Sequence, residues 1–222
     1  MKFNRPLIIA SSSPRRQFLM KEVGFHFHVE KPESDESFPD VMQVEAVPKF
    51  LAGQKAETFK STIKDEIVMT ADTIVIIDGE ILNKPVDRHH AIGMLTRLSG
   101  RTHTVITAVC LLDREKQDVF DDRTNVTFNK LSREEIEFYV DTHKPFDKAG
   151  AYGAQECLPA GVNPCSQEEI KFLKEINKID LIEKSINTKT GSGIACIEKI
   201  TGSYFTVMGL PIHMVYKHLL NF

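Results

Sequence analysis

The sequence predicts a mixed α/β fold, because strand patterns and helix patterns follow one another along the chain. Three observations carry this prediction. An apolar strand pattern at Leu7–Ala10 leads into a helix pattern that starts at Pro14. A run rich in β-branched residues spans Ile67–Ile77. Two further strand patterns, Thr102–Leu112 and Val119–Phe128, have the spacing of an antiparallel hairpin.

Composition is that of an ordinary globular protein. Of the 222 residues, 41% are hydrophobic and 27% are charged, which allows a substantial core and argues against disorder. The net charge of -3 argues against broad binding of nucleic acid, which needs a basic surface. We therefore expect no nucleic-acid partner.

The four cysteines are scattered without a CxxC pair, so they predict reduced thiols rather than a zinc site or a disulfide framework. No apolar run approaches the roughly 20 residues that span a bilayer. We expect a cytoplasmic protein without signal peptide or membrane partner.

The stretch Pro6–Val23 suggests an anion site. Ser13 suits the N-cap position and Pro14 the first helical position, so the helix should begin at Pro14. Free N–H groups at a helix start attract anions, and the guanidiniums of Arg15 and Arg16 match phosphate geometry. Three serine hydroxyls come just before: Ser11, Ser12 and Ser13. Two interpretations stay open, a polyphosphate pocket or an ordinary capped helix with two solvated arginines.

The next segment contains two further charged candidates. A short strand pattern covers Phe25–Val29, and the acidic loop after it contains Asp35 and Glu36. Either acid could face the anion pocket, or the loop could be a solvated turn. A helix pattern then runs from about residue 43 to 59, with Lys55 near its apolar stripe. Lys55 either reaches water past apolar neighbours or contacts a ligand.

Asp72 interrupts the strongest strand pattern, Ile67–Ile77. A carboxylate in so apolar a strand is costly unless it is paired or binds a metal, so Asp72 is the acid most suited to a function. The alternative is an aspartate at a strand bulge or end. The pair Asp78-Gly79 then predicts a hairpin that returns the chain as far as Leu82.

Two helices should follow with side-chain caps. Asp87 caps a helix to about Leu98, in which we interpret His89 and His90 as surface residues. Ser132 forms a capping box with the glutamate three residues later, for a helix to about residue 141.

The loop Phe146–Gln155 has small residues and glycines around Lys148, which indicates either backbone held close to a ligand or a flexible loop. From residue 156 to 193 the sequence becomes turn-rich and charged, and we interpret it as a surface insertion with a helix capped by Ser166. Ile194–Ile200 and Ser203–Met208 then have the pattern of a last hairpin, followed by an amphipathic helix.

Seven motifs in order resemble the Maf family of nucleoside triphosphate pyrophosphatases. They are SSSPRR (11–16), LAGQKA (51–56), ADTIV (71–75), NKPVD (83–87), LSGRTHTVITAV (98–109), DKAGAYGAQ (147–155) and VMGLP (207–211). The resemblance implies a single domain over residues 1–222, with a long curved mixed sheet flanked by helices. It also implies two lobes with a central cleft, similar to the inosine triphosphate pyrophosphatases.

The resemblance further implies hydrolysis of a nucleoside triphosphate between its α- and β-phosphates, with Mg²⁺ or Mn²⁺ as cofactor, and a homodimer. It gives the general-base role to Asp72 and substrate discrimination to Arg15, Thr73 and Gln155. It assigns substrate or metal contacts to a larger set: Ser11, Arg16, Glu36, Lys55, Lys84, Asp87 and Lys148. Among the acids, Glu36, Asp72 and Asp87 are the candidate metal ligands.

The motif ending in Gln155 is similar to the subgroup that prefers dTTP and UTP. Ala154 and the lengthened segment after Gln155 depart from the family pattern beside a base-reading residue. A second difficulty is that Asp72 and Thr73, adjacent on one strand, should point to opposite faces.

Rival interpretations differ in class. One is a non-catalytic nucleotide-binding regulator of cell division, which the acids disfavour because carboxylates without a metal repel phosphate. Others are a phosphatase or nucleotidyltransferase using the same pocket, and a nucleic-acid-binding module.

Overall fold

The structure is a computed structural model that describes residues 5–159, 161–186 and 194–222. These residues form a seven-stranded mixed sheet in the order β2-β1-β3-β5-β6-β7, with β4 paired to β3. The strands are β1 (Leu7–Ala10), β2 (His28–Glu30), β3 (Ile67–Ile77), β4 (Glu80–Leu82), β5 (Thr102–Leu112), β6 (Gln117–Phe128) and β7 (Ile197–Thr201). β1 runs parallel to β2 and β3, and the other pairs are antiparallel. The predicted mixed α/β class is confirmed.

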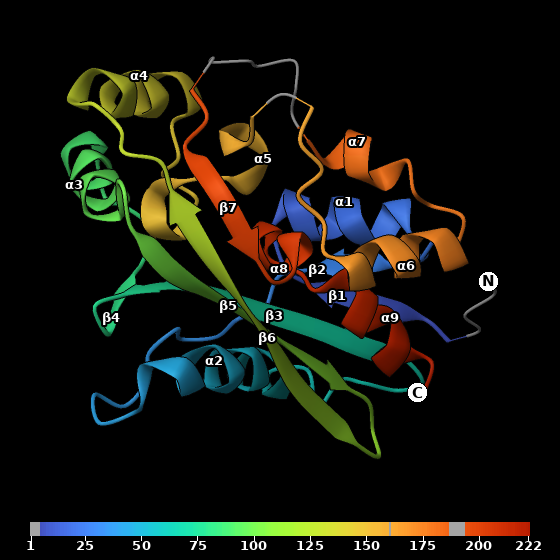
Figure 1. Cartoon of the computed structure of the whole chain (residues 1–222). Helices are drawn as coiled ribbons and strands as arrows, with labels where there is room; N and C mark the ends of the chain where they lie inside the picture. Colours follow the sequence, from blue (N-terminus) through green and yellow to red (C-terminus); the bar gives the residue numbers. More distant parts are fainter. Residues whose placement is uncertain (1–4, 160, 187–193) are drawn as a thin grey trace.

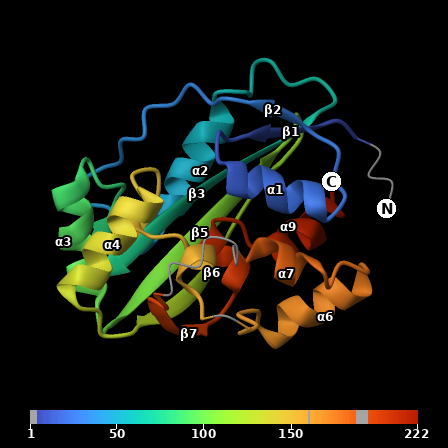
Figure 2. The same ribbon diagram turned by 90° about the horizontal axis from the view of Figure 1, so that it is seen from above.

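Helices flank the sheet on both sides. They are α1 (Pro14–Glu22), α2 (Val47–Glu57), α3 (Arg88–Leu98), α4 (Arg133–His143), α5 (Ala154–Cys157), α6 (Gln167–Glu175), α7 (Leu181–Ser185), α8 (Tyr204–Met208) and α9 (Ile212–Leu219). Two short 3-10 turns, η1 (Val44–Ala46) and η2 (Ala149–Ala151), complete the described set. Among the described helices, α2 covers one face of the sheet, whereas α1, α8 and α9 lie on the opposite face (Figure 1). Seen from above, α6 and α7 extend this second layer outward (Figure 2).

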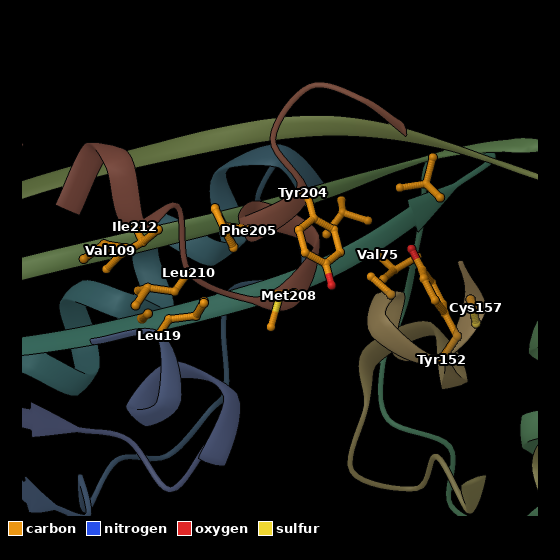
Figure 3. Packing of buried hydrophobic residues seen from close by; sticks show 14 of the residues in the cluster. Leu19, Val75, Val109, Tyr152, Cys157, Tyr204, Phe205, Met208, Leu210 and Ile212 are labelled. Carbon is orange, nitrogen blue, oxygen red and sulfur yellow. The ribbon is translucent and has the colours of Figure 1, made fainter. Parts of the chain in front are cut away.

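Strand β3 divides the core because its side chains alternate between the two faces. Met69 and Val75 belong to the main core cluster, together with residues of α1, α8 and α9. Ile74 and Ile76 pack instead with Val47 and other residues under α2. We call these the main-core face and the α2 face. Figure 3 shows part of the main-core packing, in which Val75, Tyr204 and Leu210 contribute.

Local sequence signals were accurate where they depend on a turn or a cap. Asp78 and Gly79 adopt φ values of 56° and 75°, as a tight hairpin turn requires. Asp87 caps α3 by accepting a hydrogen bond from the His90 amide. Capping boxes start α4 at Ser132 and α6 at Ser166.

The predicted hairpin at Ile194–Ile200 and Ser203–Met208 is wrong. β7 pairs with β6, and residues 204–208 form helix α8. The Ser203 hydroxyl accepts a hydrogen bond from the Thr206 amide, which is an N-cap contact. Gly209, with φ of 105°, ends the helix. The cap and the burial of Tyr204 and Phe205 outweigh the β-propensity of this apolar run.

Within residues 156–193, predicted as a surface insertion, several described side chains are buried rather than exposed. Phe172, Leu173, Leu181 and Ile182 of this segment are buried in the same cluster as α1 and β3. These side chains close one side of the main core, so α6 and α7 are part of the domain's packing. Residues 160 and 187–193 lie outside the described residues.

Two predicted boundaries shift. The strand pattern at Phe25–Val29 becomes a shorter strand, His28–Glu30, because Phe25 is buried in the core before the strand begins. The predicted helix over residues 43–59 is divided into η1 and α2, and Pro48 stands in the first turn of α2, where a missing N–H costs little.

Candidate active site

A gap in the sheet opens beside the middle of β3. β1 pairs with β3 only at Ile67–Met69, and β4 pairs with it only from Val75 onward. On that edge, no ladder partner in the described chain reaches residues 70–74, and a cavity of about 750 Å³ lies there. Because a free edge exposes side chains of both faces, Asp72 and Thr73 line one cavity from opposite sides of the strand. The predicted difficulty for this pair is resolved without a bulge.

On the α2 face, three charged residues form what we call the acid–lysine cluster: Glu36, Lys55 and Asp72. Lys55 Nζ lies 2.7 Å from Asp72 Oδ1 and 2.8 Å from Glu36 Oε1. Lys55 belongs to α2, and only 8% of its side chain is exposed. Its hydrogen bond to Glu36 lowers the pKa of that carboxyl. Lys55 thus fixes the orientation of Asp72 and brings two carboxylates to one point.

On the main-core face, the Arg16 guanidinium contacts neutral oxygens. Its Nε donates to the Gly209 carbonyl at 2.8 Å, and one terminal nitrogen donates to the Ala71 carbonyl at 2.8 Å and to Ser11 Oγ at 3.2 Å. The other terminal nitrogen donates to Thr73 Oγ1 at 3.0 Å. Burial lowers the pKa of Arg16 to about 10, so the group is charged at neutral pH. We call Arg16 with these acceptors the arginine cradle.

The start of α1 forms the adjoining wall. Helix α1 begins at Pro14, as predicted, and Ser13 occupies the N-cap position. The Ser13 side chain makes no capping bond there, and the Ser13 amide donates instead to Ser11 Oγ at 3.3 Å. The first turn of α1 therefore faces the cavity without a capping side chain, which suits an anion.

Arg15 and Lys148 form a third cationic group. Asp147 lies between them, with one oxygen 3.4 Å from an Arg15 terminal nitrogen and the other 2.9 Å from Lys148 Nζ. Burial raises the pKa of Asp147, but the hydrogen bond and charge of Lys148 and the charge of Arg15 lower it below its usual value. Glu156 Oε1 lies 3.7 Å from Lys148 Nζ, and Glu156 Oε2 accepts a hydrogen bond from the Tyr139 hydroxyl.

Gln155 and Lys84 also line the cavity. The Gln155 side-chain oxygen is buried and has no hydrogen-bond partner among the described residues. A buried amide oxygen without a partner is costly, so a ligand donor at this position would be favoured. Lys84 is exposed at the rim, and its charge helps to lower the pKa of Glu36.

Asp87 does not join the other predicted site residues. It is exposed, does not line the cavity, and uses its carboxylate to cap α3. Across the described chain, no three His, Cys, Asp or Glu residues form a group that could hold a metal ion. Glu36 and Asp72 converge on the Lys55 ammonium, so they can offer oxygens to a cation that also binds phosphate. This mode suits Mg²⁺, which usually binds one or two carboxylates plus substrate phosphate.

Sequence reasoning missed two groups that shape the cavity. Asp147 stands next to Lys148, which was predicted as a site residue. An acid beside a candidate cation could have indicated that Asp147 also belongs to the site. Gly209 lies within the motif VMGLP, but the motif does not indicate that its carbonyl contacts Arg16, because only the fold brings the end of α8 there.

Residues 6–169 match the family model described as Maf-like protein. A dTTP/UTP pyrophosphatase of Bacteroides fragilis is 41% identical over 215 residues, covering 96% of this chain and 94% of that protein. Proteins of the same name from Flavobacterium psychrophilum and Symbiobacterium thermophilum are 38% and 39% identical and are covered to 95% and 93%. The chain belongs to the Maf-like protein family.

A solved structure of the Staphylococcus aureus Ham1 protein overlaps 56% of this chain and 72% of its own, at 14% identity and a TM-score of 0.42. An overlap of this quality supports no argument about activity. Within the described residues, no helix is both long enough and apolar enough to span a membrane.

Proposed function

We propose that this chain hydrolyses dTTP and UTP to the nucleoside monophosphate and pyrophosphate. The observation that carries the proposal is one cavity with two unlike walls: a buried arginine held by neutral oxygens, and a carboxylate held by a lysine. The arginine wall suits binding of a polyphosphate. The carboxylate wall suits a general base that accepts a proton from water. The names of the relatives agree with this combination.

In the proposed reaction, water attacks the α-phosphorus and the bond from that phosphorus to the oxygen shared with the β-phosphorus breaks. Asp72 accepts the proton that the water loses, and pyrophosphate leaves with the bridging oxygen. Lys55, 2.7 Å from Asp72 Oδ1, holds this carboxylate in one orientation for this step. The negative charge of the triphosphate is compensated by the start of α1 and by three cations, Arg15, Arg16 and Lys148.

A divalent ion, Mg²⁺ or Mn²⁺, would be held by Glu36 and Asp72 together with the substrate's phosphate oxygens. When bound, such an ion lowers the pKa of water and offsets phosphate charge. Lys55 would have to release at least one of these carboxylates to make room, because its ammonium now occupies the point where they converge.

For the base, Gln155 is the proposed reader. Its unpartnered oxygen can accept a hydrogen bond from a pyrimidine N–H, while its amide nitrogen can donate to a ring carbonyl. A cytoplasmic location and a homodimer stay predictions; the four cysteines, all free, are consistent with the first.

The test is a panel of canonical and modified nucleoside triphosphates, each assayed with Mg²⁺ and with Mn²⁺ for pyrophosphate and for orthophosphate. We expect pyrophosphate and monophosphate in equal amounts, fastest with dTTP and UTP. Orthophosphate as the product would indicate a phosphatase instead. Tight binding without either product would favour the nucleotide-binding regulator.

A further inference from the structure

We propose that Glu169, in helix α6, is a positioning residue that holds Arg16 in place through helix α8. The proposal rests on the phosphate-binding role proposed above for Arg16. It gives a function to the segment after Gln155, in which the sequence showed no catalytic pattern.

Glu169 is fully buried, and its carboxylate accepts hydrogen bonds from neutral donors. Oε1 accepts from the Ser203 hydroxyl at 2.6 Å and from the Phe205 amide at 2.9 Å. Oε2 accepts from the Tyr204 amide at 3.2 Å and from the Ser166 amide at 2.8 Å. Three of these donors belong to the first residues of α8 and its cap. Since a buried carboxylate is costly without hydrogen bonds, Glu169 ties α6 firmly to the start of α8.

The other end of α8 contacts the arginine cradle. The helix has five residues and ends at Gly209, whose carbonyl accepts the Nε–H of Arg16. A second chain of hydrogen bonds joins the middle of α8 to Thr73. Thr107 Oγ1 donates to the Thr206 carbonyl at 2.8 Å and lies 2.9 Å from Thr73 Oγ1.

The donor and acceptor roles along this second chain of hydrogen bonds follow from one another and end at Arg16. Because the Thr107 hydroxyl hydrogen goes to Thr206, Thr107 must accept from Thr73, and the Thr73 oxygen is left to accept from Arg16. Two of the contacts of Arg16 thus depend directly or indirectly on where α8 lies. A shift of this short, buried helix at its start would move both.

The first experiment follows the Arg16 Nε–H by ¹⁵N NMR in the full chain. Arg16→Lys identifies the signal, because lysine lacks this group. We expect a slowly exchanging Nε–H in the unchanged protein and an exchange-broadened or shifted one in Glu169→Gln, since the amide nitrogen of glutamine would face N–H donors. The matched control is Leu173→Ala, which removes a fully buried side chain from the same helix and should leave the Arg16 signal in place.

The second experiment measures binding of inorganic tripolyphosphate. We expect Glu169→Gln to weaken binding about fivefold or more, and less than about twofold when Arg16 is already lysine, because residues that act through one another are not additive. Leu173→Ala should not weaken binding at temperatures where it is folded. If Glu169→Gln does not fold, Glu169→Asp replaces it under the same criteria.

An unchanged Arg16 signal in the Glu169 variant would overturn the proposal, and so would a loss of binding that is undiminished in the Arg16→Lys background. Neither measurement requires turnover. Failure of the proposed activity would instead appear as absence of pyrophosphate release from dTTP by the unchanged protein.

Discussion

The two faces of β3 hold their cations in different ways at the same point of the sheet. On the α2 face, Lys55 contacts two carboxylates, so its charge is compensated within the chain. On the main-core face, the contacts of Arg16 are carbonyl and hydroxyl oxygens, so its charge is oriented but not compensated by direct contact. The difference separates two tasks: the first face orients an acid, and the second retains positive charge for a ligand.

The site lies at the sheet edge because only there can side chains from both faces of β3 meet. A strand inside a fully paired sheet would keep Asp72 and Thr73 in separate compartments, because alternate side chains face opposite layers. Where β1 ends and β4 has not begun, both compartments open into one cavity.

The largest expected effect is that of Asp72→Asn on the α2 face. Asparagine keeps the shape and loses the base, so kcat should fall about 10³-fold, within the range known for general acid–base catalysis. Folding and dTTP binding should persist within a few-fold. Single-turnover release of pyrophosphate and equilibrium binding measure the two quantities. Retention of most activity with metal supplied would remove Asp72 from the mechanism.

Arg16→Lys tests the main-core face while keeping the charge. Lysine cannot reproduce the forked contacts to Thr73 and Gly209, so kcat/KM for dTTP should fall by about 30- to 100-fold, as for the loss of a charged hydrogen bond. Arg15→Lys is the matched comparison, because within the described chain the Arg15 guanidinium pairs with one side chain, Asp147, at the longer distance of 3.4 Å. Equal losses in the two variants would contradict the special role of the cradle.

Low pH should destabilise the fold through His103, which lies on the main-core face. Burial lowers the pKa of His103 from 6.5 to about 3, and its Nε2 lies 2.7 Å from the hydroxyl of Tyr152, which lines the cavity. As the pH falls, His103 therefore takes up a proton in the unfolded chain before it does so in the folded protein. The stability gained from the neutral, buried His103 is complete above about pH 6.5 and is lost as the pH falls toward 3. The free energy of unfolding should fall by about 2 to 3 kcal/mol between pH 6.5 and 4.5 from this group. Urea titrations at several pH values measure this free energy of unfolding. It should fall less steeply with decreasing pH in His103→Gln than in the unchanged protein, and identical slopes would refute the assignment of this pH dependence to His103.

The smallest expected effect concerns the base. Gln155→Ala removes the unpartnered oxygen, and the ratio of dTTP to GTP turnover should fall by about fivefold to tenfold while total turnover changes less. Gln54→Ala serves as a control, because Gln54 also has a buried side-chain oxygen without a partner in the described residues but does not line the cavity. An unchanged ratio in Gln155→Ala would place base selection elsewhere.

Sequence patterns predicted best where the cause is local. The start of α1 at Pro14, the turn at Asp78-Gly79 and the caps at Asp87 and Ser166 each depend on a few neighbouring residues. Patterns were misleading where burial decides. The run 204–208 has β-propensity yet forms a helix, because Ser203 and the buried Glu169 satisfy its first amides.

The candidate site divides in the same way. Residue chemistry selected Arg16, Lys55 and Asp72 from the sequence, because phosphate and proton transfer require cations and an acid, and the family motifs supported the selection. Asp87 was selected on the same grounds, but the structure uses it as a helix cap outside the cavity.

By itself, the sequence determined the family, the mixed α/β class, the strand that carries Asp72 and the helix that begins at Pro14. Only the tertiary structure decided that both faces of β3 open into one cavity and that the Gly209 carbonyl meets Arg16. The reason is that a cap or a turn is set by residues a few positions apart. A shared cavity and a contact across 193 positions arise only when the whole sheet and its covering helices have packed.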